Sequence, residues 1–314
     1  MTARLTAVVA CLVLTACTGP DTVRHSPGQQ KADLVIGVLP IIDVAPVYIA
    51  DKRGLFRKEG LNVKIEVLGG GADALPRLIG KSMDISFGNY LTWFNAQAGG
   101  LADLKVVADG YHTGKGTHRI VAAKDSPIRT LADLSGKKIA VNALNSVPSL
   151  LVRRAAGEAG VKLDDKRDFV AVPFPEMIPA LENKQVDAAF LGEPFAGAAA
   201  AKGMTTVAEI PAGFPVAGYA ATAAFVKDNP DTVAAFQRAM AAGARIAADR
   251  VALGEILPTY VKGLNPAPGG LAIGTYPQAA DAATLQGVSD TMARLGYFGG
   301  KRPVRAADLI TPAR

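Results

Sequence analysis

Short apolar runs recur along most of the chain, and segments long enough for helices lie between them. Strands that alternate with helices are typical of βαβ units and a mostly parallel sheet flanked by helices. The pattern therefore predicts an α/β fold. The expected strands cover residues 34–39, 63–67, 85–87, 105–108, 120–123, 139–141, 169–172, 188–191 and 220–226.

The first apolar run has a different character. Arg4 precedes an apolar stretch over residues 5–16, which is far shorter than the ~20 residues of a membrane-spanning helix. Such a stretch with small residues at its end is typical of a secretory signal peptide. Leu-Thr-Ala-Cys at 14–17 also resembles the bacterial lipoprotein box, in which cleavage precedes a lipid-bearing cysteine. We expect residues 1–16 to be the signal peptide and Cys17 to be lipidated; an ordinary signal cut elsewhere and a buried N-terminal helix are the alternatives.

Residues 17–32 are rich in Gly, Pro, Ser and Gln, and this composition indicates a flexible tether. Both cysteines, Cys11 and Cys17, precede the body of the chain, so the body has neither a disulfide nor a thiolate metal site. Two or three acyl chains on Cys17 would anchor the protein firmly. The sequence therefore predicts an extracytoplasmic body held at a bacterial cell membrane.

An internal repeat divides this body. Residues 75–90 match residues 178–193 at an offset of 103, and the same offset places residues 36–38 over 139–141. Any two βα units resemble each other, but several matches in one register favour two equivalent domains. Ligands of such open sheets bind beyond the carboxyl ends of the strands, so two facing domains predict a cleft. The aligned pairs include Pro76 with Pro179, Lys81 with Lys184, Asp84 with Asp187, Phe87 with Phe190 and Tyr90 with Glu193.

Several stretches resemble the substrate-binding proteins of ABC importers, in the branch that binds sulfonates, taurine, nitrate or thiamine-pyrimidine precursors. They are APVYIADKRGLFRKEGLNVKIE (45–66), LADLSGKKIAV (131–141), VDAAFLGEP (186–194) and FVKDNPDTVAAFQRAMAAGARIAAD (225–249). The resemblance covers about residues 33–312 and implies a two-domain type II periplasmic-binding-protein fold. It implies a domain I of residues 33–115 and 218–314, a domain II of 119–212, and a hinge at the two crossovers.

Four loops at the strand ends are predicted to face the cleft. The candidate ligand-binding residues are Ile42, Asp43, Asn89, Tyr90, Trp93, Asn145, Ser146, Ser149, Glu193 and Tyr219. Simpler roles compete with ligand contact for several of them. Asp43 suits a helix N-cap, Trp93 suits core packing, and one of the residues at 145–149 suits capping of the next helix.

The charges of these candidates bear on the ligand. They include Asp43 and Glu193 but no Arg or Lys. A buried anion without a partner costs several kcal/mol, and a helix N-terminus returns only ~0.5–2 kcal/mol. An aminopyrimidine-like thiamine precursor, or a taurine-like sulfonate with its ammonium group, is therefore favoured over nitrate or a simple alkanesulfonate. Arg119 or Arg153 would reverse this preference if either reached the cleft.

Other classes of protein fit less well. The sequence has no G-x-S-x-G or H-E-x-x-H motif, and its three histidines do not form a metal-binding pattern. The net charge of +6 comes from scattered basic residues, which fits solvated helix faces. Nucleic-acid binding is not expected, because the sequence has no motif for it and the predicted localisation is outside the cytoplasm. We expect a monomeric binding protein, not an enzyme, that uses no cofactor or metal and delivers its ligand to a permease. An enzyme on the same fold, related to thiamine-pyrimidine synthesis, and a ligand-sensing receptor subunit are the alternatives.

Overall fold

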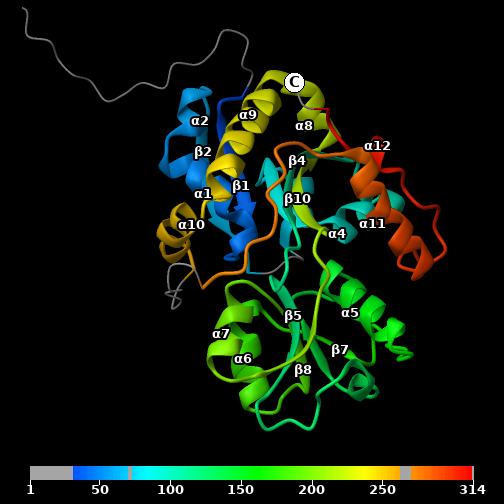
Figure 1. Ribbon diagram of the computed structural model, residues 1–314. Helices are drawn as coiled ribbons and strands as arrows, with labels where there is room; N and C mark the ends of the chain where they lie inside the picture. The colour runs from blue at the N-terminus through cyan, green and yellow to red at the C-terminus, as the bar shows by residue number, and fades with distance from the viewer. Residues whose placement is uncertain (1–30, 70–72, 262–269, 313–314) are drawn as a thin grey trace, which may run out of the picture.

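The computed structural model describes residues 31–69, 73–261 and 270–312 (Figure 1). The predicted signal peptide and Cys17 lie outside these residues. The described chain forms two five-stranded sheets, each covered by helices, which lie one above the other in Figure 1. We call each sheet with its helices a lobe. In the described ranges, no helix combines the length and the hydropathy needed to cross a membrane.

The first sheet has the strand order β2-β1-β3-β10-β4. β1 runs parallel to β2 and β3, whereas β10 is antiparallel to both β3 and β4. The central strand β3 is buried along its whole length, as expected for a strand covered on both faces. The strands are β1 (Asp33–Val38), β2 (Asn62–Val67), β3 (Ile85–Asn89), β4 (Leu104–His112) and β10 (Pro215–Thr222).

The second sheet repeats this arrangement with the order β7-β6-β8-β5-β9. β6 runs parallel to β7 and β8, and β5 is antiparallel to β8 and β9. The strands are β5 (His118–Ala122), β6 (Ile139–Val141), β7 (Phe169–Ala171), β8 (Ala188–Gly192) and β9 (Thr205–Glu209). Each sheet therefore has one antiparallel strand, β10 in the first and β5 in the second. In each case this strand is the first one after the chain has crossed over from the other lobe.

Helices cover the faces of both sheets, and several have a proline at their first or second position, where the missing N–H would have no partner within the helix. In the first lobe, α9 packs on α1 and α2, and α11 packs on α4 and β10. The helices and 3-10 turns of this lobe are η1 (Ile42–Val44), α1 (Ala45–Lys52), α2 (Leu55–Lys58), α3 (Ala74–Ile79), α4 (Tyr90–Ala98), α8 (Ala223–Asp228), α9 (Pro230–Ala247), α10 (Arg250–Ile256), η4 (Leu257–Thr259), α11 (Ala282–Arg294) and α12 (Ala306–Leu309). Those of the second lobe are η3 (Leu131–Leu134), α5 (Val147–Glu158), α6 (Phe174–Glu182) and α7 (Phe195–Ala201).

Two features of the sequence repeat have counterparts in the structure of both lobes. Asp84 accepts the backbone N–H of Val35 at 2.9 Å, and Asp187 accepts that of Lys138 at 2.8 Å. Both pairs are related by the same offset of 103. Lys81 and Lys184, which are aligned by that offset, share a φ of 57°, a left-handed conformation uncommon outside glycine. The two lobes therefore use the same turn and the same carboxylate to join helix and strand.

Two crossovers connect the lobes, over residues 113–117 and 210–214. Thr113 ties them together, because its Oγ1 donates to Pro211 O at 2.7 Å and its N–H donates to Phe214 O at 2.9 Å. Gly116 and Gly213, one in each crossover, have φ values of 73° and 89°, which side chains disfavour. We propose that these crossovers are the hinge, and that domains I and II keep the boundaries given above.

Two predictions of secondary structure were wrong. The predicted strand over 220–226 ends at Thr222, because the Thr222 side chain caps α8 by accepting the N–H of Phe225. β9 was not predicted. It is an edge strand in which exposed and half-buried residues, Thr-Thr-Val-Ala-Glu, replace the apolar run of a central strand.

Candidate functional site

A cavity of about 30 Å³ lies between the lobes, at the carboxyl ends of the parallel strands. This volume holds about two water molecules. An organic ligand therefore needs the lobes to move apart before it can enter. The described lining consists of Leu39, Ile41, Asp43, Phe87, Gly88, Asn89, His118, Asn142, Pro148, Phe174, Phe190, Gly192, Glu193, Val216 and Ala217.

Asp43 is the acidic residue that the first lobe contributes. It lies in η1, directly beyond β1, with only 2% of its surface exposed. Its carboxylate does not cap α1, whose N-cap residue is Val44 and shows no side-chain cap bond. Burial raises the pKa of Asp43 to about 7, and its own backbone N–H offsets only part of this. Its own N–H is the partner that the described part of the chain gives this carboxylate, which leaves it able to pair with a donor in the cavity.

Glu193 is the acidic residue that the second lobe contributes to the cavity. It follows β8 and is 1% exposed, and its carboxylate accepts the N–H of Gly197 at 3.2 Å. Burial raises the pKa of Glu193 to about 7, against the lowering effects of the Gly197 and Ala272 N–H groups and of Arg119. The carbonyl oxygen of Glu193 also accepts the N–H of Ile42 at 3.3 Å, a main-chain link across the mouth of the cleft.

Aromatic rings form the walls of the cavity. Phe87 and Phe190 occupy equivalent positions in the repeat, and Phe174 adds a third ring from the start of α6. His118 lies 5.5 Å from Phe190, centroid to centroid, and its Nδ1 is 3.0 Å from Thr117 Oγ1. Burial lowers the pKa of His118 to about 4, so the imidazole is neutral at pH 7. The walls therefore suit a flat, unsaturated ligand.

Two amides also face the cavity. Asn89 uses its Oδ1 to cap α4 by accepting the N–H of Thr92 at 3.0 Å. Asn142 follows β6, and its Oδ1 is buried without a hydrogen-bond partner among the described residues. An unpaired buried acceptor is costly, which makes Asn142 Oδ1 a candidate acceptor for a ligand N–H.

The structure brings three of the ten predicted residues, Asp43, Asn89 and Glu193, into the cavity lining. Ile42 lies beside it and contributes backbone contacts. Tyr90 and Trp93 point into the first lobe instead. Tyr90 donates to Asp109, and Trp93 Nε1 donates to Gly218 O at 3.2 Å. Core packing is thus the role that the structure gives to Trp93.

The remaining candidates also lie outside the lining. Tyr219 is buried behind the cavity, edge-on to Phe87 at 5.4 Å. Asn145 is exposed with a φ of 49°, so it serves the turn before α5. Ser146 and Ser149 bond each other's backbone in a capping box at the start of α5. Capping, the simpler role, accounts for both hydroxyl groups.

No arginine or lysine lines the cavity within the described residues. Arg119 pairs with Glu209 at 3.6 Å, and Arg153 pairs with Asp165 at 2.9 Å. Arg153 is therefore held by another carboxylate. Arg119 is held only loosely, because its Nε has no hydrogen-bond partner among the described residues and its charge lowers the pKa of Glu193, but neither arginine lines the cavity. The same ranges contain no cluster of three His, Cys, Asp or Glu side chains placed to hold a metal ion.

The sequence reasoning missed His118, Asn142 and the three phenylalanines. The repeat could have identified Phe87 and Phe190, because they are aligned by its offset of 103 and each lies just before a loop predicted to face the cleft. Asn142 stood at the start of a predicted loop but was not selected. His118 gave no such signal, because it reaches the cavity only through the antiparallel course of β5 beside β8.

Comparisons with known proteins agree with this geometry. Residues 41–250 match the model of the family described as NMT1/THI5 like. A curated relative from Brucella abortus, named as a binding protein, is 32% identical over 150 residues, which make up 48% of this chain and 44% of the relative. The chain thus spans less than half the length of the curated relatives that it matches first.

Solved structures show the same fold. The alkanesulfonate-binding protein SsuA from Xanthomonas axonopodis pv. citri, bound to MOPS, superposes with a TM-score of 0.75 and 20% identity, covering 90% of this chain and 99% of that chain. The desulfurization enzyme DSZB superposes with a TM-score of 0.64 and 16% identity, covering 90% and 97%. The two-lobed architecture is the type II periplasmic-binding-protein fold, and the chain belongs to the NMT1/THI5-like family.

Proposed function

We propose that this protein is the extracytoplasmic solute-binding component of an ABC importer. In this proposal it captures a small, flat molecule rich in N–H donors, of the aminopyrimidine class, and delivers it to a membrane permease. The observation that carries the proposal is a pair of carboxyl groups, Asp43 and Glu193, which reach one aromatic-walled cavity from opposite lobes. A ligand that bonds both groups holds the lobes together.

The choice of ligand class follows from charge. The cavity offers acceptors in Asp43, Glu193 and Asn142, and no basic side chain from the described residues. A nitrate or sulfonate group placed there would face two carboxyls with no cation in the described lining to contact it, at a cost of several kcal/mol. An aminopyrimidine instead supplies N–H donors to the carboxyl groups and a flat face to the phenylalanines.

Capture would proceed by hinge closure. The lobes separate about the two crossovers, ligand enters, and contacts made by both lobes favour the closed form. The backbone bond from Ile42 to Glu193 forms only when the lobes meet. Lys31, next to the last residue of the predicted tether, is bonded to the first lobe by Asp84 at 2.6 Å and by Thr232. The tether therefore leads to the first lobe, and the second lobe is the one free to swing.

Binding rather than catalysis is our proposal for the cavity. The fold alone does not decide, because the superposable DSZB is an enzyme. Among the described lining residues there is no Ser, Thr, Cys or Lys to act as a nucleophile. His118 has a depressed pKa of about 4, which makes it a poor proton carrier near pH 7. Asp43 and Glu193, whose pKa burial raises to about 7, suit proton transfer, so the turnover measurement below is what separates binding from catalysis.

Thermal-shift titration tests the proposed function. The panel comprises aminopyrimidine precursors of thiamine, taurine, alkanesulfonates and nitrate. A ligand at a hundred times its Kd adds ~2.7 kcal/mol, which raises Tm by several degrees. We expect this shift with an aminopyrimidine. A shift with nitrate or simple sulfonates alone would refute the assignment of ligand class, and turnover of the bound compound would refute the binding-protein assignment.

Membrane attachment has a separate test. We propose that Cys17, which lies outside the described residues, carries the lipid anchor. Cys17→Ser should move the protein from the membrane fraction to the soluble fraction, because a lipid-free chain keeps no acyl anchor. Fractionation followed by immunoblotting measures this, with Cys11→Ser as the control that stays membrane-bound. A Cys17→Ser protein that still sediments with membranes would contradict the lipoprotein assignment.

A further inference from the structure

We propose that Tyr297, Arg153 and Asp165 form a clasp between the lobes, which positions the second lobe for ligand binding without touching the cavity. Tyr297 follows α11, which packs on the first lobe, whereas Arg153 and Asp165 belong to the second. The clasp is therefore a contact between parts that hinge motion separates. None of its three side chains lines the cavity.

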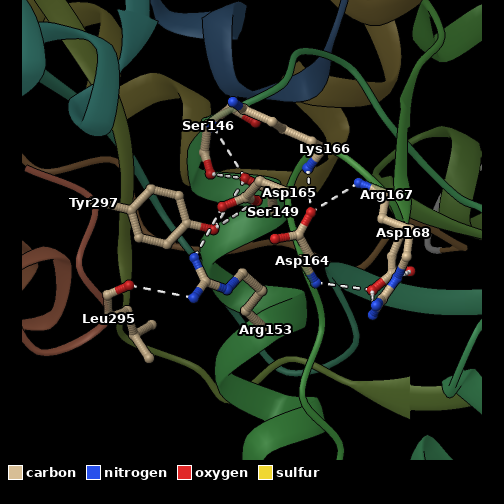
Figure 2. A network of polar contacts seen from close by, with 10 residues as sticks. All are labelled: Ser146, Ser149, Arg153, Asp164, Asp165, Lys166, Arg167, Asp168, Leu295 and Tyr297. Atoms are coloured by element: carbon tan, nitrogen blue, oxygen red, sulfur yellow. Dashed lines mark hydrogen bonds and ion pairs between the residues drawn. The ribbon is translucent and has the colours of Figure 1, made fainter. Parts of the chain in front are cut away.

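The geometry of the clasp is specific (Figure 2). The Tyr297 hydroxyl points at Asp165 Oδ1, at 3.1 Å, and Arg153 Nη1 donates to Asp165 Oδ2 at 2.9 Å. The guanidinium of Arg153 also lies over the Tyr297 ring, 4.8 Å from its centroid, and its Nη2 donates to Leu295 O at 3.3 Å. Arg153 is thus bonded to its own lobe and to the other lobe at once.

Burial gives these contacts weight. Tyr297 is 8% exposed, and the Arg153 and Asp165 side chains are only 24% and 17% exposed. Each ordinary hydrogen bond of this kind changes an equilibrium by about two- to tenfold, and a cation over an aromatic ring adds to that. Surface ion pairs contribute little by comparison. The clasp therefore biases the balance between closed and open forms.

The clasp also reaches the end of α5 that borders the cavity. The Tyr297 hydroxyl lies 3.3 Å from Ser149 Oγ, and Ser149 belongs to the capping box that starts α5. Pro148, its neighbour, lines the cavity. Holding Ser149 from the first lobe consequently fixes a wall of the ligand site. By this inference, Tyr297 and Arg153 are positioning residues. Without them, the free energy that favours the closed form must come from ligand contacts alone.

The experiment compares Tyr297→Phe and Arg153→Ala with Arg154→Ala, without added ligand. Arg154 is the matched control, because this neighbouring arginine pairs with Glu158 on its own helix. All variants carry Cys17→Ser in the full-length chain, so that detergent is not needed. Small-angle X-ray scattering reports lobe separation, and hydrogen exchange reports the Ile42 amide, which bonds Glu193 across the cleft mouth.

We expect both clasp variants to show a larger radius of gyration and Ile42 exchange that is faster by about two- to tenfold. Arg154→Ala should match the parent protein in both. Thermal unfolding confirms that each variant is folded, and Tyr297→Phe alone carries the test if Arg153→Ala fails to fold. An unchanged radius and unchanged Ile42 exchange in folded Tyr297→Phe would overturn the proposal, and neither readout depends on the identity of the ligand.

Discussion

Replacing Glu193 with Gln should weaken binding of the aminopyrimidine that gives the largest thermal shift by more than tenfold. The amide keeps the size of the side chain and can still accept the N–H of Gly197. It cannot offer a negative charge to a ligand donor in a site that is 1% exposed. A hydrogen bond to a charged group contributes ~1.5–3 kcal/mol, and 1.4 kcal/mol is a factor of ten in Kd. Isothermal titration calorimetry measures the change.

Glu182→Gln is the matched control for this variant. Glu182 is an exposed residue of the same lobe that pairs with Lys202 at 2.7 Å. Loss of this ion pair should leave Kd unchanged, because exposed ion pairs contribute little and Glu182 does not line the cavity. An unchanged Kd for Glu193→Gln would remove Glu193 from the site, whatever the ligand.

Most of the fold could be predicted from the sequence, because residues with the same structural role recur at the same offset in the two halves of the repeat. Asp84 and Asp187 both accept an N–H from the start of the neighbouring strand, so each unit needs an aspartate there. The same register placed Glu193 at the end of a buried strand, where side chains of an open sheet meet a ligand. Position along the chain was therefore enough to predict that this residue lies at the cavity, and its contact with a ligand stays a prediction.

The direction of side chains within helices was not readable. Tyr90 and Trp93 begin a helix at the cleft, yet both rings point into the first lobe, where Asp109 and Gly218 O satisfy their polar atoms. Those partners come from β4 and β10, distant in sequence. His118 was missed for a related reason. Its place depends on pairing with β8, a non-local contact that no local pattern encodes.

The ligand-free protein should lose stability as pH rises from about 5 to about 7. Burial raises the pKa of both Asp43 and Glu193 to about 7, against ~4 in an unfolded chain. In this range the folded state holds two protons that the unfolded state has released, so stability falls with pH. His118 has the opposite effect. Its pKa is about 4 in the folded state, so below about pH 6.5 the unfolded state holds a proton on His118 that the folded state lacks, which cancels the contribution of one carboxyl group. The net slope is ~1.4 kcal/mol per pH unit, or about 2–3 kcal/mol in all. Urea unfolding at a series of pH values measures it.

The double variant Asp43→Asn, Glu193→Gln should reverse the sign of this dependence. Of the three cavity groups, His118 then remains, and its unfolded form takes up a proton below about pH 6.5, so stability should rise with pH. A parent protein whose stability is flat or rises from pH 5 to 7 would show that the carboxyl groups titrate near their ordinary pKa. A saturating ligand that pairs with both carboxylates should abolish the falling slope, because pairing lowers their pKa. The charges that destabilise the ligand-free fold at neutral pH are then the ones that a donor-rich ligand stabilises.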